Sequence, residues 1–329
     1  MHIGQGGHSA GPKLPRKRSR ARQRTNPFDF RVREGPVKYG AATAPAQPAP
    51  SSNVFYYNPA AGIKLIKGDC LEIMAQAPAE CVDMVFADPP YFLSNNGITC
   101  HAGRMVSVNK GKWDASKGAL ADHEFIKKWL KECHRVLKPD GTIWVSGTLH
   151  VIYSVGYAMQ ELGYKILNDI VWEKPNPPPN LACRYFTHST EIILWARKSD
   201  KARHYYNYAL MKEINGGKQM KNVWRFNSPD TEEKRYGKHP TQKPVKLLER
   251  IILASTREGD LVLDPFVGSG TTAVAAVRHG RRSVGIDLEE SYLAVAAKRI
   301  EDEIARKNSS SSAGGEKWNA PKPLASSGS

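Results

Sequence analysis

Short runs of apolar residues alternate along the chain with longer stretches in which apolar residues recur every three or four positions. The short runs are rich in Val, Ile, Leu and Trp and are followed by turn residues, as is typical of buried strands. The sequence predicts strands at 63–66, 82–86, 142–145, 169–172, 192–195, 261–263 and 283–286. This alternation predicts an α/β fold, in which one seven-stranded, mostly parallel sheet is covered by helices on both faces.

Helical spacing of apolar residues follows several of these strands. Each helical stretch ends close to a glycine, the residue that most often terminates a helix. The predicted helices are 122–137, 151–162 and 244–256. In such an alternating fold, ligands bind beyond the carboxyl ends of the strands, so the residues that follow the strands are the candidates for function.

Three segments depart from the alternation. Residues 1–50 lack an apolar period and are rich in Gly, Pro and Arg, which predicts a flexible basic arm. Residues 175–237 combine prolines, glycine pairs, tyrosines and basic residues, which predicts an insertion that carries target recognition. Residues 308–329 begin with a run of serines and predict a disordered tail. The remaining residues, 51–307, are expected to form one domain.

The net charge of the chain restricts the class of molecule that it is expected to bind. The chain has 329 residues with 48 Lys+Arg against 32 Asp+Glu, a net charge of +16. Residues 1–40 hold ten Lys or Arg and two Asp or Glu, so half of the excess, +8, lies in the arm and the other half in the rest of the chain. Such a charge favours a polyanion, either nucleic acid or an acidic membrane surface. Whether the arm binds nucleic acid or is only a solvated extension stays open.

Cysteine usage points to a reducing compartment. The five cysteines form no C-x-x-C pair, and no N-terminal apolar segment marks secretion, so we expect a cytoplasmic protein. None has His or Cys partners at ligand spacing, and no metal site is predicted. The cysteines are Cys70, Cys81, Cys100, Cys133 and Cys183. The sequence also lacks an apolar stretch long enough to cross a membrane.

The first chemical signal is Asp88-Pro89-Pro90-Tyr91, directly after the strand predicted at 82–86. The prolines fix the backbone and remove two donors, which leaves a carboxylate and free carbonyls as a rigid group of acceptors beside an aromatic ring. Such a group suits a planar amine: Asp88 and the Pro89 carbonyl each accept one hydrogen while Tyr91 stacks on the ring. The alternative is an ordinary turn with Asp as the turn former.

The second signal is the segment 264–272, Asp-Pro-Phe-Val-Gly-Ser-Gly-Thr-Thr, between a strand and a helix. Gly268 and Gly270 permit a tight turn and close approach of the backbone to a ligand. Asp287 ends the next strand, where an acid can hold ribose hydroxyls. Because Gly-x-Gly-x-x-Ala is also a dinucleotide fingerprint, an NAD-dependent oxidoreductase is an alternative.

Two weaker signals remain. Residues 238–244, Lys-His-Pro-Thr-Gln-Lys-Pro, offer donors for a carboxylate, although a basic loop with Pro244 in the first turn of a helix explains them equally well. Asp69 and Cys70 follow the strand predicted at 63–66, where Asp69 is either a ligand or the cap of a helix.

Together these signals resemble one family, the amino-group DNA methyltransferases that use S-adenosylmethionine, in the permuted order in which the catalytic tetrapeptide precedes the glycine loop. The resemblance covers about 54–304 and implies a Rossmann-like methyltransferase fold with one antiparallel strand. Within the family the chain is most similar to the DpnA-type adenine-N6 methyltransferases of GATC-specific restriction-modification systems. The stretches that carry this likeness are 86–94, 105–111, 183–191, 202–208 and 237–244.

The resemblance implies two sets of site residues. The catalytic set, which holds the target base, is Asp88, Pro89 and Tyr91. The set that binds S-adenosylmethionine is Asp69, Cys70, His239, Thr241, Gln242, Lys243, Asp264, Phe266, Gly268, Gly270 and Asp287. In the second set Asp287 binds the ribose, Asp69 binds the adenine amino group with Cys70 beside it, and the 239–243 segment faces the carboxylate. The methionine end of the cofactor is lined by Asp264, Phe266, Gly268 and Gly270.

The implied substrate is DNA, and the enzyme is expected to be a monomer or a homodimer. The amine of a paired base is buried in the duplex, so the enzyme flips the nucleotide out or starts from a single strand. Basic side chains that could reach phosphates or bases are Arg184, Lys201, Arg203, Lys218, Lys221 and Arg225. The polar segment 94–117 is a candidate loop to close over the base. The loops around Asp88 and Asp264 carry no Lys or Arg, which suits a cationic methyl donor.

Cytosine and protein glutamine are alternatives to adenine as the group that accepts the methyl. Cytosine-N4 methylation uses the same geometry, but in the permuted group the tetrapeptide then usually starts with Ser, so Asp88 favours adenine. A protein-glutamine methyltransferase would resemble an Asn-Pro-Pro-Tyr version and would not need a net charge of +16. The likeness to the DpnA type implies methylation within GATC on single- as well as double-stranded DNA.

Overall fold

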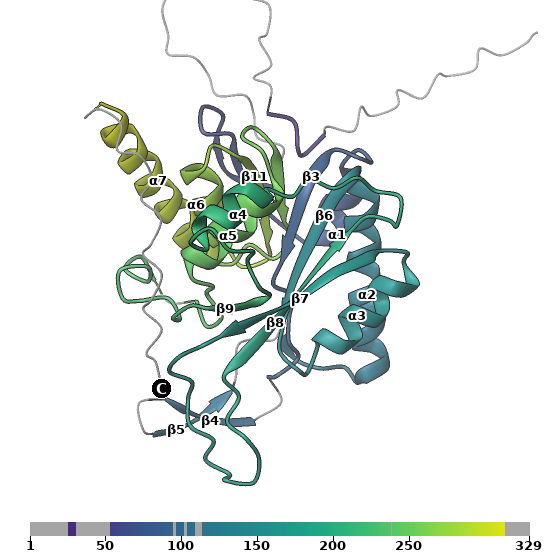
Figure 1. The fold of residues 1–329 in the computed structure, drawn as a ribbon, viewed down its shortest axis with the longest axis vertical. Helices are drawn as coiled ribbons and strands as arrows, with labels where there is room; N and C mark the ends of the chain where they lie inside the picture. The colour runs from purple at the N-terminus through teal and green to yellow at the C-terminus, as the bar shows by residue number, and fades with distance from the viewer. Residues whose placement is uncertain are drawn as a thin grey trace, which may run out of the picture.

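The structure is a computed structural model that describes residues 26–30, 53–94, 97–101, 104–108, 114–237 and 239–312 (Figure 1). One sheet forms the centre of the molecule, and its strand order is β1-β2-β11-β10-β3-β6-β8-β7-β9. The strands are β1 (Val54–Asn58), β2 (Ile63–Lys67), β3 (Val82–Ala87), β6 (Leu137–Gly147), β7 (Lys165–Glu173), β8 (Thr190–Arg197), β9 (Val223–Arg225), β10 (Leu261–Asp264) and β11 (Arg282–Asp287). All seven predicted strands are present in this sheet.

The sheet is mostly parallel. From β2 to β6 all neighbours pair in parallel, while β8 is antiparallel to both β6 and β7. The single antiparallel strand that the resemblance implied is therefore β8. Two edge strands are additional: β1 pairs antiparallel with β2, and β9 pairs in parallel with β7. The expected count of seven was low because β9 has only three residues and β1 is interrupted by a register shift.

Helices cover both faces of the sheet (Figure 1). They are α1 (Cys70–Gln76), α2 (Ala119–Val136), α3 (Ile152–Glu161), α4 (Tyr208–Ile214), α5 (Val245–Ser255), α6 (Thr271–Arg278) and α7 (Glu290–Ser312). The first three pack on one face, where Trp129 of α2 is fully buried. The other four pack on the opposite face, where Leu248 of α5 and Leu293 of α7 are buried. The predicted helices correspond to α2, α3 and α5.

The folded domain extends past both of the boundaries predicted for it, 51 and 307. Residues 26–30, within the predicted flexible arm, pack on the sheet: Phe28 is buried, and the Lys64 ammonium donates to the carbonyls of Pro27 and Asp29. The buried Lys64 side chain needs acceptors, which explains why this part of the arm is ordered. At the other end α7 continues to Ser312, five residues past the predicted boundary. The rest of the predicted arm and tail lies outside the described residues.

The segment 175–237 is not a separate insertion. Its strand β8 pairs between β6 and β7, and β9 extends the sheet beyond β7. What leaves the body is the loop between β7 and β8, which projects past the carboxyl ends of the parallel strands (Figure 1). A two-stranded hairpin, β4 (Gly97–His101) and β5 (Arg104–Val108), projects at the same end and replaces part of the polar loop expected at 94–117.

No helix within the described ranges is long and apolar enough to cross a membrane.

Candidate active site

Asp88 lies at the carboxyl end of β3, at the centre of the sheet, and both of its carboxylate oxygens accept hydrogen bonds. The Tyr91 hydroxyl donates to Oδ1 at 2.5 Å, and the Lys243 ammonium donates to Oδ2 at 2.5 Å. Lys243 is almost completely buried and comes from the loop before α5, 155 residues away in the chain. The carboxylate is thereby fixed in place before any ligand reaches it.

A buried aspartate that sequence reasoning missed shapes the loop after Asp88. Asp114 is fully buried, and its carboxylate accepts from the backbone amides of Tyr91, Phe92 and Leu93 at 2.8, 2.9 and 3.1 Å and from the Ser94 hydroxyl at 2.9 Å. These bonds satisfy a turn in which Phe92 has a φ of 57°, a region that side chains other than glycine rarely adopt. No local pattern around Asp114 indicates this role, because its partners lie about 20 residues earlier.

Polar side chains continue from Asp88 across the neighbouring strands. The last residues of β3 and β6 lie side by side, since Ala87 pairs with Val145, and the end of β6 lies beside the start of β8, since Gly147 pairs with Ile192. Asp88, Ser146 and Glu191 therefore come together at the carboxyl end of the parallel strands. Ser146 of β6 lies 3.2 Å from the Tyr91 hydroxyl, and Glu191 of β8 lies 3.4 Å from it.

Two lysines hold Glu191. Its Oε1 accepts from Lys174, which directly follows β7, and its Oε2 lies 3.6 Å from the Lys243 ammonium. Glu191 is buried, whereas Lys174 is partly exposed. Sequence reasoning assigned no role to Glu191. The loops around Asp88 and Asp264 carry no Lys or Arg, and the cation beside Asp88 comes from a distant segment, the loop before α5.

The electrostatics of this group follow from burial and charge. Burial raises the pKa of Asp88, the Lys243 charge opposes this, and the Glu191 charge adds to it, so that the pKa is raised overall. Burial lowers the pKa of Lys243, but the charges of Asp88 and Glu191 outweigh burial and raise it. Burial raises the pKa of Tyr91 well above its usual value. Lys243 is therefore protonated and Tyr91 neutral, so both act as donors to Asp88.

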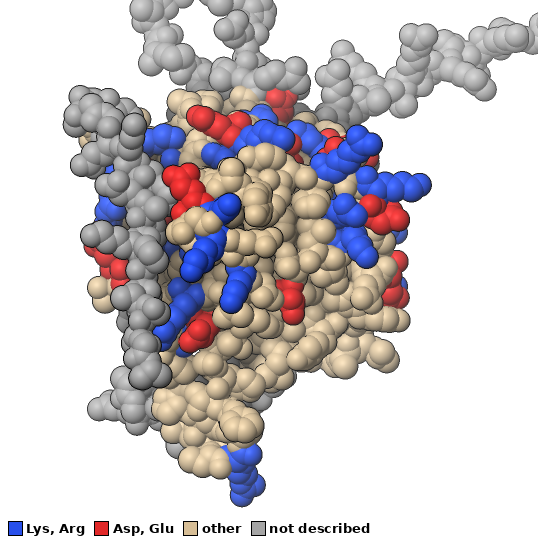
Figure 2. Space-filling model, viewed as in Figure 1, with Lys and Arg blue, Asp and Glu red and all other residues tan. Residues whose placement is uncertain are grey.

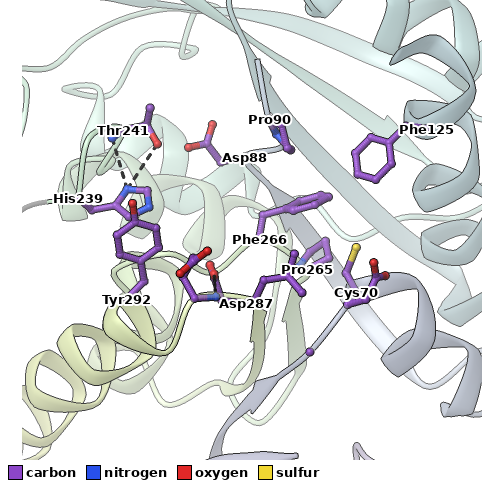
Figure 3. Close-up of a pocket in the computed structure, with 14 residues that line it drawn as sticks. Cys70, Asp88, Pro90, Phe125, His239, Thr241, Pro265, Phe266, Asp287 and Tyr292 are labelled. Carbon is purple, nitrogen blue, oxygen red and sulfur yellow. Dashed lines mark hydrogen bonds between the residues drawn. The ribbon is translucent and has the colours of Figure 1, made fainter. Parts of the chain in front are cut away.

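A cleft of about 850 Å³ opens beside Asp88 at the carboxyl ends of the strands (Figure 3). Its lining residues come from the loops after β2, β3, β10 and β11, from α2 and α7, and from the segment before α5. They are Gly68, Asp69, Cys70, Asp88, Pro90, Phe125, His239, Thr241, Pro265, Phe266, Asp287, Leu288, Glu289 and Tyr292. A cleft that is lined by aromatic and apolar side chains together with a few acidic groups is typical of sites for cofactors and drug-sized ligands.

Two acidic residues of the predicted cofactor set line this cleft. Asp287, at the end of β11, accepts from the backbone amides of Gly268 and Glu289, both at 2.9 Å. Burial raises the pKa of Asp287. Asp69 caps α1 by accepting from the Leu71 amide at 2.7 Å, so the structure supports the capping interpretation while also placing Asp69 in the lining. Cys70 lies beside it, and burial raises its pKa to about 12.

The glycine loop requires its glycines. Gly268 has a φ of 49°, and a Cβ there would lie 2.9 Å from Nε2 of His239. Gly270 has a φ of 80°, and a Cβ would lie 2.7 Å from the Cβ of Ala296 in α7. The loop therefore packs closely against His239, which lines the cleft, and against α7; the close approach of its backbone to a ligand stays a prediction.

Asp264 does not face the main cleft. It is buried, its Oδ2 accepts from the Thr272 hydroxyl at 2.5 Å, and its Oδ1 accepts from the Phe266 amide at 3.0 Å. Burial raises its pKa to about 7. Asp264 thereby shapes the loop that presents Phe266 to the cleft. It also borders the smaller cavity that adjoins the cleft, so its place at the methionine end of the cofactor stays a prediction.

The side chains of residues 239–243, before α5, point in different directions. His239 and Thr241 line the cleft and contact each other, as Figure 3 shows. The Gln242 amide donates to the Glu233 carbonyl at 2.9 Å, while its buried oxygen has no hydrogen-bond partner and borders a smaller adjoining cavity. Lys243, predicted on the carboxylate side of the cofactor, instead points to Asp88.

Tyr91 is buried rather than presented to the cleft. Only 4% of its surface is exposed, its hydroxyl donates to Asp88, and the Lys243 ammonium lies 5.4 Å from its ring centre. The expectation that Tyr91 stacks on the target base is therefore not met in this conformation, since the hydroxyl engages the carboxylate. Pro90, by contrast, borders the cleft.

The predicted DNA-binding residues are all exposed but do not share one surface. Arg184 lies in the loop between β7 and β8, and Arg225 ends β9 beside Glu173, both at the end of the sheet that carries Asp88. Lys201 and Arg203 follow the carboxyl end of the antiparallel β8, which places them at the opposite end.

The remaining two, Lys218 and Lys221, precede β9, and the Asn222 amide that follows them is held by Asp169 in the middle of β7. In Figure 2, basic and acidic side chains intermix over the body of the molecule, whereas the projection at the Asp88 end is largely uncharged. Aromatic residues take their place there: Tyr185 and Phe186 are 63% and 94% exposed.

Comparisons with known proteins agree with this geometry. Residues 82–298 match the family model N6_N4_Mtase, described as DNA methylase. The chain is 60% identical over 249 residues to the type II methyltransferase M2.DpnII of Streptococcus pneumoniae, a match that covers 75% of this chain and 92% of that protein. It is 50% identical over 238 residues to M2.MboI of Moraxella bovis, covering 72% and 87%.

Solved structures agree as well. The M1.HpyAVI–SAM complex is 28% identical with a TM-score of 0.55, covering 72% of this chain and 98% of that one. The cytosine-N4-specific PvuII DNA methyltransferase, 21% identical with a TM-score of 0.58 over 74% of this chain and 92% of that one, shares the fold. An acidic residue fixed at the end of β3, a ligand-sized cleft beside it and these matches lead to one conclusion: the chain belongs to the N6_N4 DNA methylase family.

Proposed function

We propose that this DNA methyltransferase transfers a methyl group from S-adenosylmethionine to the N6 amine of adenine within GATC, on single- as well as double-stranded DNA. The observation that carries the proposal is the Asp88 carboxylate, held by two donors at the edge of a ligand-sized cleft. An NAD-dependent oxidoreductase loses its support, because family membership explains the glycine loop and the Asp88 loop together.

The residues of the cleft fit S-adenosylmethionine. Asp287 offers a carboxylate for ribose hydroxyls, the glycine loop allows close approach, and Phe266 supplies an apolar wall. The Gln242 oxygen, buried without a partner, is a free acceptor for an ammonium group in the adjoining cavity. When bound, this compound supplies an activated methyl group on a sulfonium centre.

The residues around Asp88 then act on the target amine. Asp88 and the Pro89 carbonyl accept its two hydrogens and orient the nitrogen lone pair toward the cleft. Methylation adds one group to the nitrogen, which must release one proton, and the Asp88 carboxylate that accepts the amine hydrogens is placed to take it. The raised pKa of Asp88 makes it a better base than an exposed aspartate.

Adenine is favoured over cytosine by the residue that opens the tetrapeptide. The DpnA-type likeness includes Asp88, whereas the permuted cytosine-N4 enzymes usually carry Ser there. The relatives named above include M2.DpnII and M2.MboI, and the cytosine-N4 enzyme shares the fold at lower identity. We also propose a cytoplasmic location, because a reducing compartment suits the free cysteines found among the described residues.

Matched oligonucleotides test the proposal directly. Single- and double-stranded DNA containing GATC, GTAC or GANTC is incubated with the enzyme and S-adenosylmethionine, and methylated bases are mapped by mass spectrometry. We expect N6-methyladenine within GATC in both forms. Methylation only in duplex would remove the single-strand proposal, another sequence would remove GATC, and methylcytosine alone would overturn the choice of base.

Arg184 provides a test of which surface meets DNA. It lies in the projecting β7–β8 loop beside the exposed Tyr185 and Phe186, on the same side as Asp88. If it contacts a phosphate, Arg184→Ala should reduce the slope of log affinity against log salt by about 1. Titrations at several salt concentrations measure this slope.

The matched control is Lys201→Ala, which removes the same charge from the opposite end of the sheet. We expect it to keep the wild-type slope. If both substitutions reduce the slope equally, the effect is one of net charge and the loop is not the interface.

A further inference from the structure

Asp88 belongs to a buried group of alternating charges that extends beyond the catalytic tetrapeptide. The order is Asp88, Lys243, Glu191 and Lys174, with two negative and two positive charges. We propose that Glu191 is a positioning residue for methyl transfer: it holds the Lys243 ammonium beside Asp88, and so sets the charge and orientation of the carboxylate that binds the amine.

The distances support a bridging position. Glu191 Oε2 lies 3.6 Å from the Lys243 ammonium and 3.4 Å from the Tyr91 hydroxyl, the two donors that bond to Asp88 at 2.5 Å each. The other oxygen, Oε1, accepts from Lys174. One buried carboxylate therefore attracts the ammonium that bonds to Asp88, and it lies beside the hydroxyl whose single proton goes to Asp88.

The backbone makes this arrangement specific. Glu191 pairs with Trp172 in β7, two residues before Lys174, and lies next to Ile192, which pairs with Gly147 of β6. Because β8 is antiparallel, its first residues lie beside the carboxyl ends of its neighbours. The reversal of this one strand brings Glu191 to the edge where Asp88 lies.

The charge balance gives the group a chemical purpose. A lone ammonium beside Asp88 would repel a cationic methyl donor, and a lone Glu191 would repel the catalytic carboxylate. With Lys243 and Glu191 both present, the two positive and two negative charges of the group sum to zero. The Lys243 ammonium still keeps its position against Asp88. Burying ionisable groups such as Lys243 and Glu191 is costly and does little for stability on average, so a role in catalysis explains the cluster better than a role in folding.

Several ionisable groups surround Asp88 and decide how it titrates. They are Lys243 before α5, Glu191 of β8, Tyr91 of its own loop, Asp264 of β10 and His239 at the rim of the cleft. Among them, Lys243 lowers and Glu191 raises the pKa of Asp88. Removing one or the other should therefore move the acidic limb of a pH–rate profile in opposite directions.

The test compares Glu191→Gln, Lys243→Met and wild type in methyl incorporation from labelled S-adenosylmethionine. For Glu191→Gln we expect kcat to fall about 10- to 100-fold, as for loss of a charge-assisted contact, with the cofactor Kd unchanged. The acidic limb of its kcat profile should move to lower pH, and that of Lys243→Met to higher pH. Glu173→Gln, which changes an exposed neighbour paired with Arg225, is the matched control and should behave as wild type.

Wild-type kcat and pH profile in Glu191→Gln would overturn the proposal, as would limbs that move in the same direction in both variants. If Glu191→Gln does not fold, Lys174→Gln is tested instead, because Lys174 is partly exposed and its ammonium contacts Glu191 and the face of Trp172 but not Asp88 itself. A fall in kcat at constant cofactor Kd would support the proposal, and an unchanged kcat would overturn it. The inference rests on amine methylation at Asp88, and it stands whether mass spectrometry of the wild-type product finds adenine or cytosine.

Discussion

Asp88→Ala is expected to reduce methyl transfer by about 10³-fold or more while leaving S-adenosylmethionine binding largely intact. The substitution removes the acceptor for the target amine and for the proton that the amine releases, two contributions that each reach about 10²-fold or more in enzymes. Single-turnover rates on GATC oligonucleotides measure the loss. Full activity in this variant would end the assignment of Asp88 to catalysis.

Two further variants control this result. Asp88→Ala leaves the buried Lys243 ammonium without its 2.5 Å partner, so Asp88→Asn, which keeps the shape of the side chain, should show the same loss with less thermal destabilisation. Asp287→Ala should do the reverse and weaken cofactor binding by ~1.5 to 3 kcal/mol, since a charged acceptor is lost. Calorimetry that finds wild-type affinity in Asp287→Ala would argue against its role at the ribose.

Asp114→Ala should lower kcat by about 100-fold although Asp114 does not line the cleft or the smaller cavity beside it. Its carboxylate accepts from three backbone amides and one hydroxyl of the loop that follows Asp88. Each buried donor left without an acceptor costs about 1–3 kcal/mol. We therefore expect the loop to leave its present conformation, and misplacement of catalytic groups by about 1 Å can cost about 10²-fold in rate.

Asp114→Asn is the graded control, because the amide keeps one acceptor oxygen and should retain an intermediate rate. Rates are measured at saturating cofactor and DNA, together with thermal unfolding of each variant. Equal rates in wild type and Asp114→Ala would show that the loop holds its shape through other contacts, and the role assigned to Asp114 would then be wrong.

The strands of the sheet were predictable because each central strand is buried on both faces and reads as a continuous apolar run. Met84, Val262 and Val284 are fully buried, for example. The edge strands were missed for the opposite reason. In β1 every residue is only half buried, and β9 contains a single buried residue, Trp224, between two exposed ones. A pattern search has little to detect in such segments.

The site was predictable where function depends on position along a strand. Asp88 and Asp287 directly follow apolar runs, and both line the cleft. The role of Lys243 was not predictable in the same way, since the ammonium meets Asp88 only after 155 residues of intervening chain fold. Asp114 and Glu191 are likewise defined by partners from other elements, and neither belongs to a local motif.

The strand order also has a consequence for synthesis of the chain. β10 and β11 lie between β2 and β3 in the sheet, yet they are the last two strands to leave the ribosome. Until Asp287 has emerged, β2 and β3 face a gap two strands wide, and both keep unpaired backbone edges that can join other chains. We therefore expect the nascent protein to need protection of these edges for most of its translation, and a premature stop before Leu261 to yield an inactive fragment that aggregates.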